Sequence, residues 1–419
     1  MTPRGTVRVP GDKSISHRAL MLAALGEGVS TVRGILQSAD VRSTARVLQA
    51  LGARIEVQGA DAVVHGRGIR GLLKPPTELE CGNSGTTTRL MAGVVAGHPF
   101  SATFVGDASL SARPMRRVAE PLELMGAQFQ FGAGDGLPMT ITGTSLQSIG
   151  FSTRTASAQI KSAILLAALV AQVPVTVSEP RHSRDHTERM LAARGVDLMV
   201  DGNTLALGVA KHLPALDVDV PGDPSAAAFF IALAAMSEGG AIDLPDVCLN
   251  PTRTGFIRVV QRMGAVVTQH DVREQGGEPV GTVRATGSST LMGITVGPGD
   301  VPSLIDELPM LACLAARATG DTLISGAEEL RFKESDRIAA VVANLRAIGV
   351  DAEERRDGMR ITGSDKPLHG QVDPLGDHRL AMAFGVLGAV PGNDLQILGP
   401  ECVEVSYPNF WADLARVTT

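Results

Sequence analysis

The sequence predicts an α/β protein of two lobes, each containing three copies of a repeating unit with one buried helix. Two observations lead to this fold class. The tetrapeptide Val-Pro-Gly-Asp occurs at residues 9–12 and again at residues 220–223, so one copy precedes each half of the 419-residue chain. Alanine-rich apolar segments also recur at intervals of roughly 70 residues, and a fixed interval of this kind indicates repeated supersecondary units.

The apolar segments are typical of helices buried in the interior of a lobe. Each is about 10–15 residues long, which is a usual length for a helix in a globular protein. Each is apolar on nearly all sides, so none of its faces suits water. The six segments begin near Ser14, Ser84, Ser157, Ser225, Asp306 and Asp377.

A second series of segments has one polar face, which predicts helices on the outside of the lobes. Five of them end in a glycine, which favours a helix end because it adopts left-handed backbone angles without a Cβ clash. Short runs of alternating apolar residues, such as 54–57 and 139–142, predict the strands. The terminal glycines are Gly52, Gly126, Gly195, Gly264 and Gly349.

The composition favours a protein that acts on small molecules. The aromatic content is only 3% and the net charge is −6, whereas nucleic-acid-binding proteins usually have a basic surplus and aromatic stacking residues. No apolar run reaches the roughly 18 residues that cross a bilayer, and the first residues contain no signal-peptide core. We therefore expect a cytoplasmic protein with no nucleic-acid or membrane partner. A local group of Arg and Lys can still bind small anions.

Two motifs suggest cofactor or metal chemistry but lack the context that it needs. Residues 66–71 match GxGxxG, but Pro75 and Pro76 occur where a dinucleotide site needs a helix. His182 and His186 lie four residues apart without an evident third ligand, so we expect exposed polar side chains and no metal. The cysteines form no CxxC pair, and we expect buried free thiols at Cys81, Cys248, Cys313 and Cys402.

Polar and cationic residues gather at the starts of the predicted helices. We interpret them as ligand-binding groups rather than ordinary caps, because helix N-termini attract anions. In a repeat fold they should converge on two facing surfaces, and so many cations would repel one another without an anionic ligand. The sequence therefore predicts a ligand with several phosphates or carboxylates. The cations are Lys13, Arg18, Arg89, Arg113, Arg184, Lys333, Arg337 and Arg379.

Two carboxylates, Asp306 and Glu334, lie within this cationic set, which suits a general base and a general acid.

The two tetrapeptides differ in the residues that come directly after them. Lys13 and Ser14 come after the first copy, whereas Pro224 and Ser225 come after the second, where we expect a plain helix start.

With these motifs the sequence resembles the enolpyruvyl transferases, and among them most closely the 5-enolpyruvylshikimate-3-phosphate synthase family. The resemblance covers nearly the whole chain. The motifs that carry it are Gly11-Asp12-Lys13-Ser14-Ile15-Ser16-His17-Arg18, Gly82-Asn83-Ser84-Gly85-Thr86, Ala112-Arg113-Pro114-Met115, Ser157-Ala158-Gln159, Lys333-Glu334-Ser335-Asp336-Arg337 and Gly376-Asp377-His378-Arg379.

The resemblance implies a two-lobed inside-out α/β barrel with six βαβαββ repeats, three in each lobe. Residues 1–11 and 224–419 would form a discontinuous first lobe, and residues 12–223 the second, with crossovers near Pro10-Gly11 and Pro221-Gly222. It also implies transfer of the enolpyruvyl group of phosphoenolpyruvate to the 5-hydroxyl of shikimate 3-phosphate, through a tetrahedral intermediate that loses phosphate. No metal or cofactor is expected, and the chain is expected to be a monomer that the inhibitor glyphosate targets.

The resemblance also assigns roles to residues of this chain. Asp306 would take the hydroxyl proton, Glu334 would exchange a proton with the methylene carbon, and Lys13 and Lys333 would complete the catalytic set. Shikimate 3-phosphate would be bound by Lys13, Ser14, Arg18, Ser157, Ala158, Gln159, Arg184, Asp306 and Lys333. Phosphoenolpyruvate would be bound by Lys13, Asn83, Gly85, Arg113, Gln159, Arg337 and Arg379.

Two other functions remain as alternatives, and this chain differs from many family members at three places. The related enzyme that uses UDP-N-acetylglucosamine carries a loop cysteine where this chain has Ala108, and a non-enzymatic anion-binding repeat protein would not need Asp306 and Glu334. Ala158 stands where many members have a second serine, and His186 where many have a tyrosine. Residues 405–408 lack a lysine that some members place there. Together the three departures suggest the second sequence class of the family.

Overall fold

The computed structural model describes residues 2–132, 134–287 and 290–418, which form two units. Unit 1 comprises Met1–Pro10, Pro221–Arg273 and Pro279–Thr419, and unit 2 comprises Gly11–Val220 and Glu274–Glu278. Both boundaries between the halves fall inside a Val-Pro-Gly-Asp copy. Three short segments differ from the predicted boundaries. Gly11 and Glu274–Glu278 belong to unit 2, and Pro221–Asp223 belongs to unit 1.

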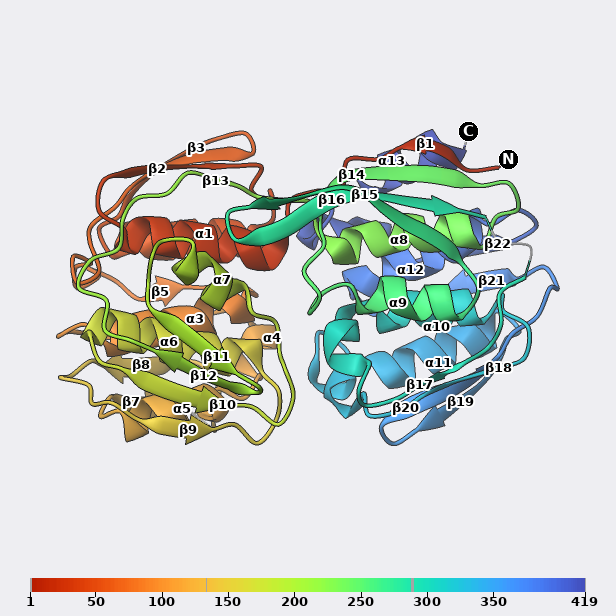
Figure 1. Cartoon of the computed structure of the whole chain (residues 1–419). Helices are drawn as coiled ribbons and strands as arrows, with labels where there is room; N and C mark the ends of the chain where they lie inside the picture. Colours follow the sequence, from red (N-terminus) through yellow and green to blue (C-terminus); the bar gives the residue numbers. More distant parts are fainter. Residues whose placement is uncertain (1, 133, 288–289, 419) are drawn as a thin grey trace. The chain divides into compact units, whose positions relative to one another are not determined.

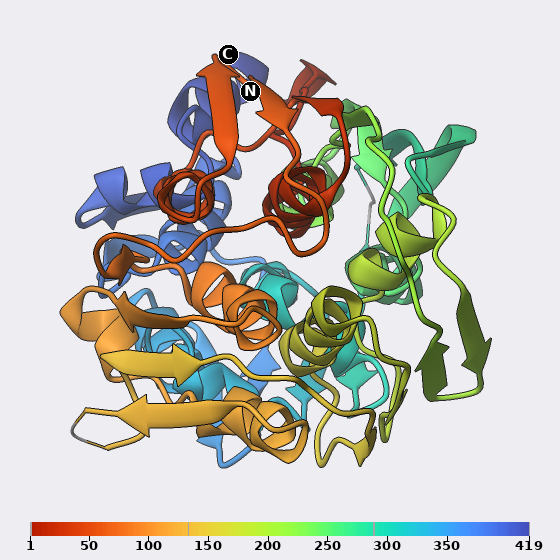
Figure 2. The same cartoon turned by 90° about the vertical axis from the view of Figure 1, so that its left-hand side faces the viewer.

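Each unit contains three of the predicted buried helices. They occur where the alanine-rich segments predict them, and nearly all of their side chains are buried. In unit 2 they are seen almost end-on in Figure 2, with the strands arranged around them. The helices are α1 (Lys13–Leu25), α3 (Gly85–Ala96) and α6 (Ala158–Ala171) in unit 2, and α8 (Pro224–Ala235), α10 (Leu308–Ala315) and α12 (His378–Ala389) in unit 1.

An outer helix follows each buried one along the chain (Figure 1), and only some of the residues of an outer helix are buried. The five predicted terminal glycines all have positive φ, between 76° at Gly195 and 112° at Gly126, which confirms their place at helix ends. The outer helices are α2 (Ala39–Ala50), α5 (Arg116–Leu124), α7 (His186–Ala192), α9 (Gly255–Arg262), α11 (Arg337–Ala347) and α13 (Phe410–Thr418); a short α4 (Ala108–Ser111) precedes α5.

The strands of a repeat form a four-stranded sheet in which the first two are parallel and the last two form a hairpin. In unit 2 the orders are β13-β2-β4-β3, β5-β6-β8-β7 and β9-β10-β12-β11. These strands are β2 (Val29–Arg33), β3 (Arg54–Gln58), β4 (Asp61–His65), β5 (Leu79–Glu80), β6 (Ser101–Val105), β7 (Gln128–Phe131), β8 (Met139–Thr142), β9 (Gly150–Ser152), β10 (Val175–Ser178), β11 (Leu198–Asp201), β12 (Thr204–Leu207) and β13 (Val218–Asp219).

Unit 1 repeats this pattern with orders β1-β14-β16-β15 and β17-β18-β20-β19, and its last repeat has the parallel pair β21-β22. The predicted fold class, six α/β repeats with buried helices, is confirmed. The strands are β1 (Arg4–Thr6), β14 (Ala241–Cys248), β15 (Val266–Gln275), β16 (Glu278–Thr286), β17 (Thr295–Val296), β18 (Asp321–Ile324), β19 (Asp351–Arg355), β20 (Gly358–Thr362), β21 (His369–Val372) and β22 (Asp394–Ile397).

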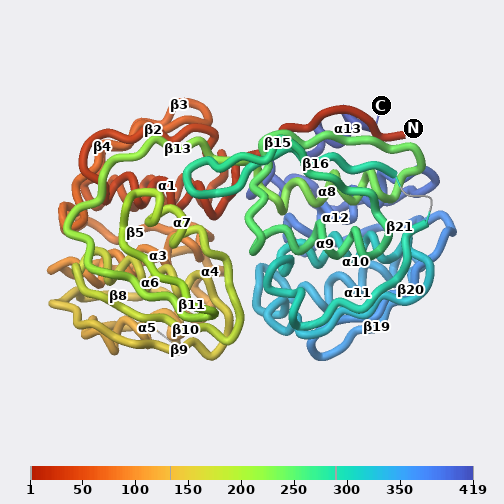
Figure 3. Tube along the Cα trace, in the orientation of Figure 1, coloured from red at the N-terminus to blue at the C-terminus, as the bar shows by residue number. Residues whose placement is uncertain are grey.

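The first strand of each unit's first sheet comes from a distant part of the sequence. β13 pairs with β2 in unit 2, and β1 pairs with β14 in unit 1, both in parallel. β1 also lies beside α13, where Arg416 donates to the carbonyl of Thr6 at 2.8 Å (Figure 3). Residues from the two ends of the chain therefore belong to one unit, which is why unit 1 is discontinuous.

The GxGxxG match, the cysteines and the apolar runs take these places in the structure. No helix follows the GxGxxG match at 66–71 before α3. Cys81, Cys248 and Cys313 are buried free thiols, but Cys402 is only half-buried. Within the described ranges, no helix combines the length and the apolar character that crossing a bilayer requires.

Gly93 allows α3 and α6 to pack closely. A Cβ at Gly93 would lie 2.1 Å from the carbonyl oxygen of Ala163, a backbone atom that cannot rotate away. Replacing a helical glycine with alanine normally stabilises a helix by about 1 kcal/mol. Here the clash should dominate, because overpacking a core costs about 1–3 kcal/mol.

We expect Gly93→Ala to lower the midpoint of urea unfolding followed by circular dichroism. Gly150→Ala, where a Cβ meets nothing within 4 Å, is the control and should leave the midpoint nearly unchanged. A Gly93→Ala protein as stable as the wild type would contradict this account of the α3–α6 contact.

Candidate active site

The starts of the three buried helices of unit 2 meet at one end of the unit. The Gln159 amide at the start of α6 donates to Thr86 Oγ1 at 3.2 Å, and Arg89 of α3 donates to Gln159 Oε1 at 3.0 Å. Arg18 of α1 donates to Ser162 Oγ of α6 at 2.9 Å. Side chains from segments far apart in the sequence therefore come together within unit 2.

Five of the buried helices start at an ordinary capping side chain, and one of these caps is Ser157, a predicted ligand. Ser84 and Ser157 accept hydrogen bonds from the backbone N–H groups of Thr87 and Ile160, and Asp12, Asp223 and Asp377 cap α1, α8 and α12 in the same way. The expectation that these starts lack ordinary caps is wrong for these five helices, whereas α10 has no side-chain cap. A helix that begins inside a core must satisfy its own first N–H groups.

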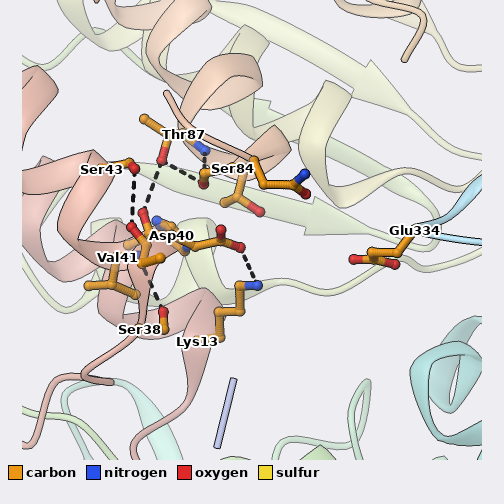
Figure 4. Close-up of polar contacts among 12 residues, drawn as sticks. Lys13, Ser38, Asp40, Val41, Ser43, Ser84, Thr87 and Glu334 are labelled. Carbon is orange, nitrogen blue, oxygen red and sulfur yellow. Dashed lines mark hydrogen bonds and ion pairs between the residues drawn. The ribbon is translucent and has the colours of Figure 1, made fainter. Parts of the chain in front are cut away.

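Lys13 forms an ion pair with Asp40 of α2, and the two side chains point toward one another in Figure 4. Ser38 caps α2 by accepting from the N–H of Val41 at 3.3 Å, which places Asp40 in its first turn. The carbonyl of Asp40 accepts from Thr87 Oγ1 at 3.4 Å. The sequence reasoning missed Asp40, because an acidic residue after a serine cap is common on solvated helices.

A chain of buried hydroxyls continues from this point. Thr87 Oγ1 lies 2.7 Å from both Ser84 Oγ and Thr44 Oγ1, and Thr44 Oγ1 lies 2.6 Å from His17 Nδ1. Burial lowers the pKa of His17 to about 3, so the imidazole is neutral. The chain joins α1, α2 and α3 next to Lys13.

Arg18 is a buried cation, 4% exposed. It donates to Thr187 Oγ1 at 2.7 Å and to the carbonyl of Ser14 at 3.0 Å, in addition to Ser162. Burial lowers the pKa of Arg18 to about 10, Glu188 opposes this shift, and the positive charge of Arg184 adds to it. Ser14, Arg18 and Arg184 therefore belong to one region of unit 2.

Arg113 is held beside the start of α3. It donates to Asn83 Oδ1 at 2.6 Å and to Ser109 Oγ at 3.2 Å, while the Asn83 amide donates to Asp107 at 2.7 Å. A Cβ at Gly85 would lie 2.8 Å from Arg89 NH1 and 3.6 Å from Arg113 NH1. The space that Gly85 leaves open thus faces two guanidinium groups.

Ser157, Ala158 and Gln159 are half-buried at the start of α6. The backbone N–H of Ser157 donates to Glu179 Oε1 at 3.2 Å. The sequence reasoning did not single out Glu179, since nothing in its sequence neighbourhood distinguishes it from a surface acid.

In unit 1, three cations surround the carboxylate of Asp306. Its oxygens lie 3.8 Å from Lys333 Nζ, 3.6 Å from Arg337 NH1 and 3.9 Å from Arg379 NH2. Arg379 also donates to the carbonyl of Asp306 at 3.2 Å. Asp306 lies in the short 3₁₀ turn Ile305–Glu307 before α10, and Arg379 lies in the first turn of α12.

Arg337 organises this group and is only 1% exposed. Its Nε donates to Asp377 at 2.8 Å and its NH2 donates to Glu334 at 2.6 Å, whereas NH1 makes no hydrogen bond within the described residues. Burial opposes the charged form, but Asp377, Glu334 and Asp306 together raise the pKa of Arg337 above its ordinary value. Burial likewise opposes the charge of Asp377, yet Arg337 keeps the pKa of that carboxyl below its usual range.

The structure therefore gathers the predicted site residues into one group in each unit. The expectation that only a ligand compensates the cations is wrong, because Asp40, Asp377 and Glu334 already pair with Lys13 and Arg337. The group of unit 2 is Lys13, Ser14, Arg18, Asn83, Gly85, Arg113, Ser157, Ala158, Gln159 and Arg184, and that of unit 1 is Asp306, Lys333, Glu334, Arg337 and Arg379.

His186 is the clearest departure from the sequence-based expectation. It is fully buried, and its Nδ1 lies 2.7 Å from the buried carboxylate of Glu278, whereas His182 is exposed as expected. Glu278 is distant in sequence, so no local pattern could have indicated the pair. In the described part of the chain, no group of three or more His, Cys, Asp or Glu side chains is arranged to hold a metal ion.

The arrangement of repeats is that of the enolpyruvyl transferase fold. The enolpyruvyl transferase NikO from Streptomyces tendae superimposes with a TM-score of 0.77 over 99% of this chain and 95% of its own, at 17% identity, a likeness that concerns the fold. An EPSP synthase from Acinetobacter baumannii superimposes with a TM-score of 0.89 at 41% identity, over 99% of this chain and 96% of its own.

The chain belongs to the EPSP synthase (3-phosphoshikimate 1-carboxyvinyltransferase) family, whose model matches residues 2–414. A 3-phosphoshikimate 1-carboxyvinyltransferase from Limosilactobacillus fermentum is 49% identical over 99% of this chain and 96% of its own length. The enzyme of the same name from Persephonella marina is 44% identical over 99% of this chain and 97% of its own. The family expected from the motifs is confirmed.

The buried pair of Arg337 and Asp377 yields a stability prediction. Asp377→Asn should destabilise unit 1 by about 3–5 kcal/mol at pH 7, because it removes the fully buried carboxylate that pairs with the Nε of the buried Arg337. The folded pKa of Asp377 is depressed, so its stabilisation is present above its unfolded pKa of about 4 and is lost as the pH falls through the folded value.

Urea unfolding at a series of pH values checks this prediction. The gap between wild type and Asp377→Asn should be widest near neutral pH and should narrow below about pH 4. Asp365→Asn, a change at an exposed carboxylate, is the control and should show no such gap. A gap that does not depend on pH would exclude a charge effect.

Proposed function

We propose that this chain transfers the enolpyruvyl group of phosphoenolpyruvate to the 5-hydroxyl of shikimate 3-phosphate and releases inorganic phosphate. The reaction is a step of the shikimate pathway, which leads through chorismate to the aromatic amino acids. The observation that carries the proposal is the carboxylate of Asp306 within 4 Å of Lys333, Arg337 and Arg379. A base among fixed cations suits a reaction in which a hydroxyl attacks an anionic substrate.

The unit 2 group supplies binding functions in this proposal. Arginine forks match the geometry of phosphate and carboxylate groups, so each substrate has suitable partners there. Shikimate 3-phosphate is held by Ser14, Arg18, Ser157, Ala158, Gln159 and Arg184 with Lys13, and in unit 1 by Asp306 and Lys333. Phosphoenolpyruvate is held by Asn83, Gly85, Arg113 and Gln159 with Lys13, and in unit 1 by Arg337 and Arg379.

The proposed chemistry is an addition followed by an elimination. The 5-hydroxyl oxygen bonds to C2 of phosphoenolpyruvate as its proton passes to Asp306, and Glu334 gives a proton to the methylene carbon. The resulting tetrahedral intermediate returns that proton to Glu334 as the bond to phosphate breaks, which restores the double bond. Lys13 and Lys333 complete the catalytic set by stabilising the charge that moves to the phosphate.

The reaction needs no oxidant or reductant, so acids, bases and cations of the chain suffice for it. We propose that the chain acts without a metal or cofactor, as a monomer in the cytoplasm. The two lobes expected from the sequence, residues 1–11 with 224–419 and residues 12–223, correspond in this proposal to units 1 and 2, apart from Gly11, Pro221–Asp223 and Glu274–Glu278.

Phosphate release tests the proposed function directly. The protein is incubated with phosphoenolpyruvate together with shikimate 3-phosphate, together with UDP-N-acetylglucosamine, or alone. Release with shikimate 3-phosphate only is the expected result. Release with UDP-N-acetylglucosamine would favour the related enzyme, and release in none of the three would favour an anion-binding protein.

Asp306→Asn tests the proposed base. It should lower kcat by roughly 10²–10⁴-fold, the usual contribution of a general base, because an amide cannot accept the hydroxyl proton. Binding of shikimate 3-phosphate, measured by calorimetry, should persist, and Asp365→Asn is again the exposed control. Unchanged kcat in Asp306→Asn would remove Asp306 from this role.

Gly85→Ala tests the placement of phosphoenolpyruvate. The new methyl group would meet Arg89 NH1 at 2.8 Å, so it should crowd the space before the guanidinium groups. We expect the inhibition constant of glyphosate, which competes with phosphoenolpyruvate, to rise more than the KM of phosphoenolpyruvate. Gly150→Ala controls for an added methyl group, and an equal loss for inhibitor and substrate would contradict the steric explanation.

A further inference from the structure

A buried cluster of three charged side chains lies beside the proposed shikimate 3-phosphate site of unit 2. Lys161 of α6 contacts both Glu179 and Glu188, each at 2.7 Å. The side chains of Lys161, Glu179 and Glu188 are 5%, 4% and 11% exposed. Burial opposes the charge of Lys161, but the two carboxylates raise its pKa, so the lysine is protonated. The proposed reaction uses none of the three.

Glu179 differs from Glu188 in what else it holds. Its Oε1 accepts from the backbone N–H of Ser157 at 3.2 Å. Its Oε2 accepts from Ser183 twice, from the hydroxyl at 2.9 Å and from the backbone N–H at 3.3 Å, as well as from Lys161. One carboxylate therefore joins the start of α6 to the loop between β10 and α7.

The two segments joined in this way carry expected ligands of one substrate. Ser157 and Arg184, the residue after Ser183, are both assigned to shikimate 3-phosphate, and neither is assigned to phosphoenolpyruvate. Burying a carboxylate costs free energy that its hydrogen bonds must offset. In return, a carboxylate held by four donors fixes the distance between the two segments more tightly than a solvated loop would.

We propose that Glu179 is a positioning residue for the recognition of shikimate 3-phosphate, because it holds Ser157 and the Ser183–Arg184 segment at the spacing that the phosphorylated substrate requires. This proposal rests on the proposed function. Glu179 touches neither substrate and acts through the residues it holds. Lys161 neutralises the carboxylate, and Glu188 balances Lys161 from the other side.

The chain offers a matched control for this idea. Glu188 shares the same lysine and is similarly buried, but its contact is with Lys161 through Oε1, and its Oε2 makes no hydrogen bond within the described residues. Glu179→Gln and Glu188→Gln thus remove the same charge from the same lysine. Only in Glu179→Gln does the new NH2 group face other hydrogen-bond donors, those of Ser157, Ser183 or Lys161. Two donors cannot bond to each other, so at least one of these hydrogen bonds is lost.

The experiment compares steady-state kinetics of wild type, Glu179→Gln and Glu188→Gln. Glu179→Gln should raise the KM of shikimate 3-phosphate by about tenfold, the effect of losing one or two well-placed hydrogen bonds, with the KM of phosphoenolpyruvate and kcat nearly unchanged. Glu188→Gln removes a charge that faces Arg18 but leaves the contacts of Ser157 and Ser183 intact, so it should raise the KM of shikimate 3-phosphate clearly less than Glu179→Gln does. Shikimate tested as a substrate should be affected less than its phosphorylated form, since the segments are assigned to the phosphorylated substrate.

Three outcomes would overturn the proposal while leaving the proposed function intact. These are an unchanged KM in Glu179→Gln, an equal rise in both variants, and a parallel rise in the KM of phosphoenolpyruvate. An inactive wild type would instead overturn the proposed function, and this proposal with it. If Glu179→Gln does not fold, Ser183→Ala replaces it, since it removes one donor from Glu179 and should raise the same KM by about threefold.

Discussion

The structure depends on one constraint, which is that the buried helices must satisfy the N–H groups of their first turns. A side chain does so in five of the six, the exception being α10. Capping side chains such as Asp12, Ser84 and Ser157 meet this need. Because the buried helices of one unit start at the same end, their caps and the polar residues next to them gather in one place. The candidate site thus results from the way the core is built, because residues that cap the helices lie next to residues with proposed binding or catalytic roles.

The same burial controls how charge is arranged. Arg337 and Lys161 are almost wholly inaccessible, and each is surrounded by carboxylates that keep it charged. Lys13, which is partly exposed, is paired with Asp40. The net positive charge of the site is therefore smaller than a count of arginines and lysines suggests. The positions of the carboxylates decide which of these cations keep an unbalanced charge.

The duplicated tetrapeptide shows how the two units diverged. Lys13 comes after the first copy and pairs with Asp40. The second copy is not the plain helix start that the sequence suggested. Ser225 is hydrogen-bonded to Glu307, and Arg253 donates to Asp223 at 2.8 Å. Both copies thus carry buried polar networks, and in unit 1 that network adjoins Asp306, the residue before Glu307.

The sequence alone determined the six repeats, the buried helices, the terminal glycines and the family, because apolar periodicity and short motifs are local in the chain. It also identified the cations and the two carboxylates of the site. Only the tertiary structure decided how they are connected, as in the pairing of Lys13 with Asp40, His186 with Glu278, and Glu179 with both Ser157 and Ser183. Except for Glu179 and Ser183, which share one loop, these partners belong to different elements of the fold, and no sequence spacing indicates which acids will meet which donors once the helices pack.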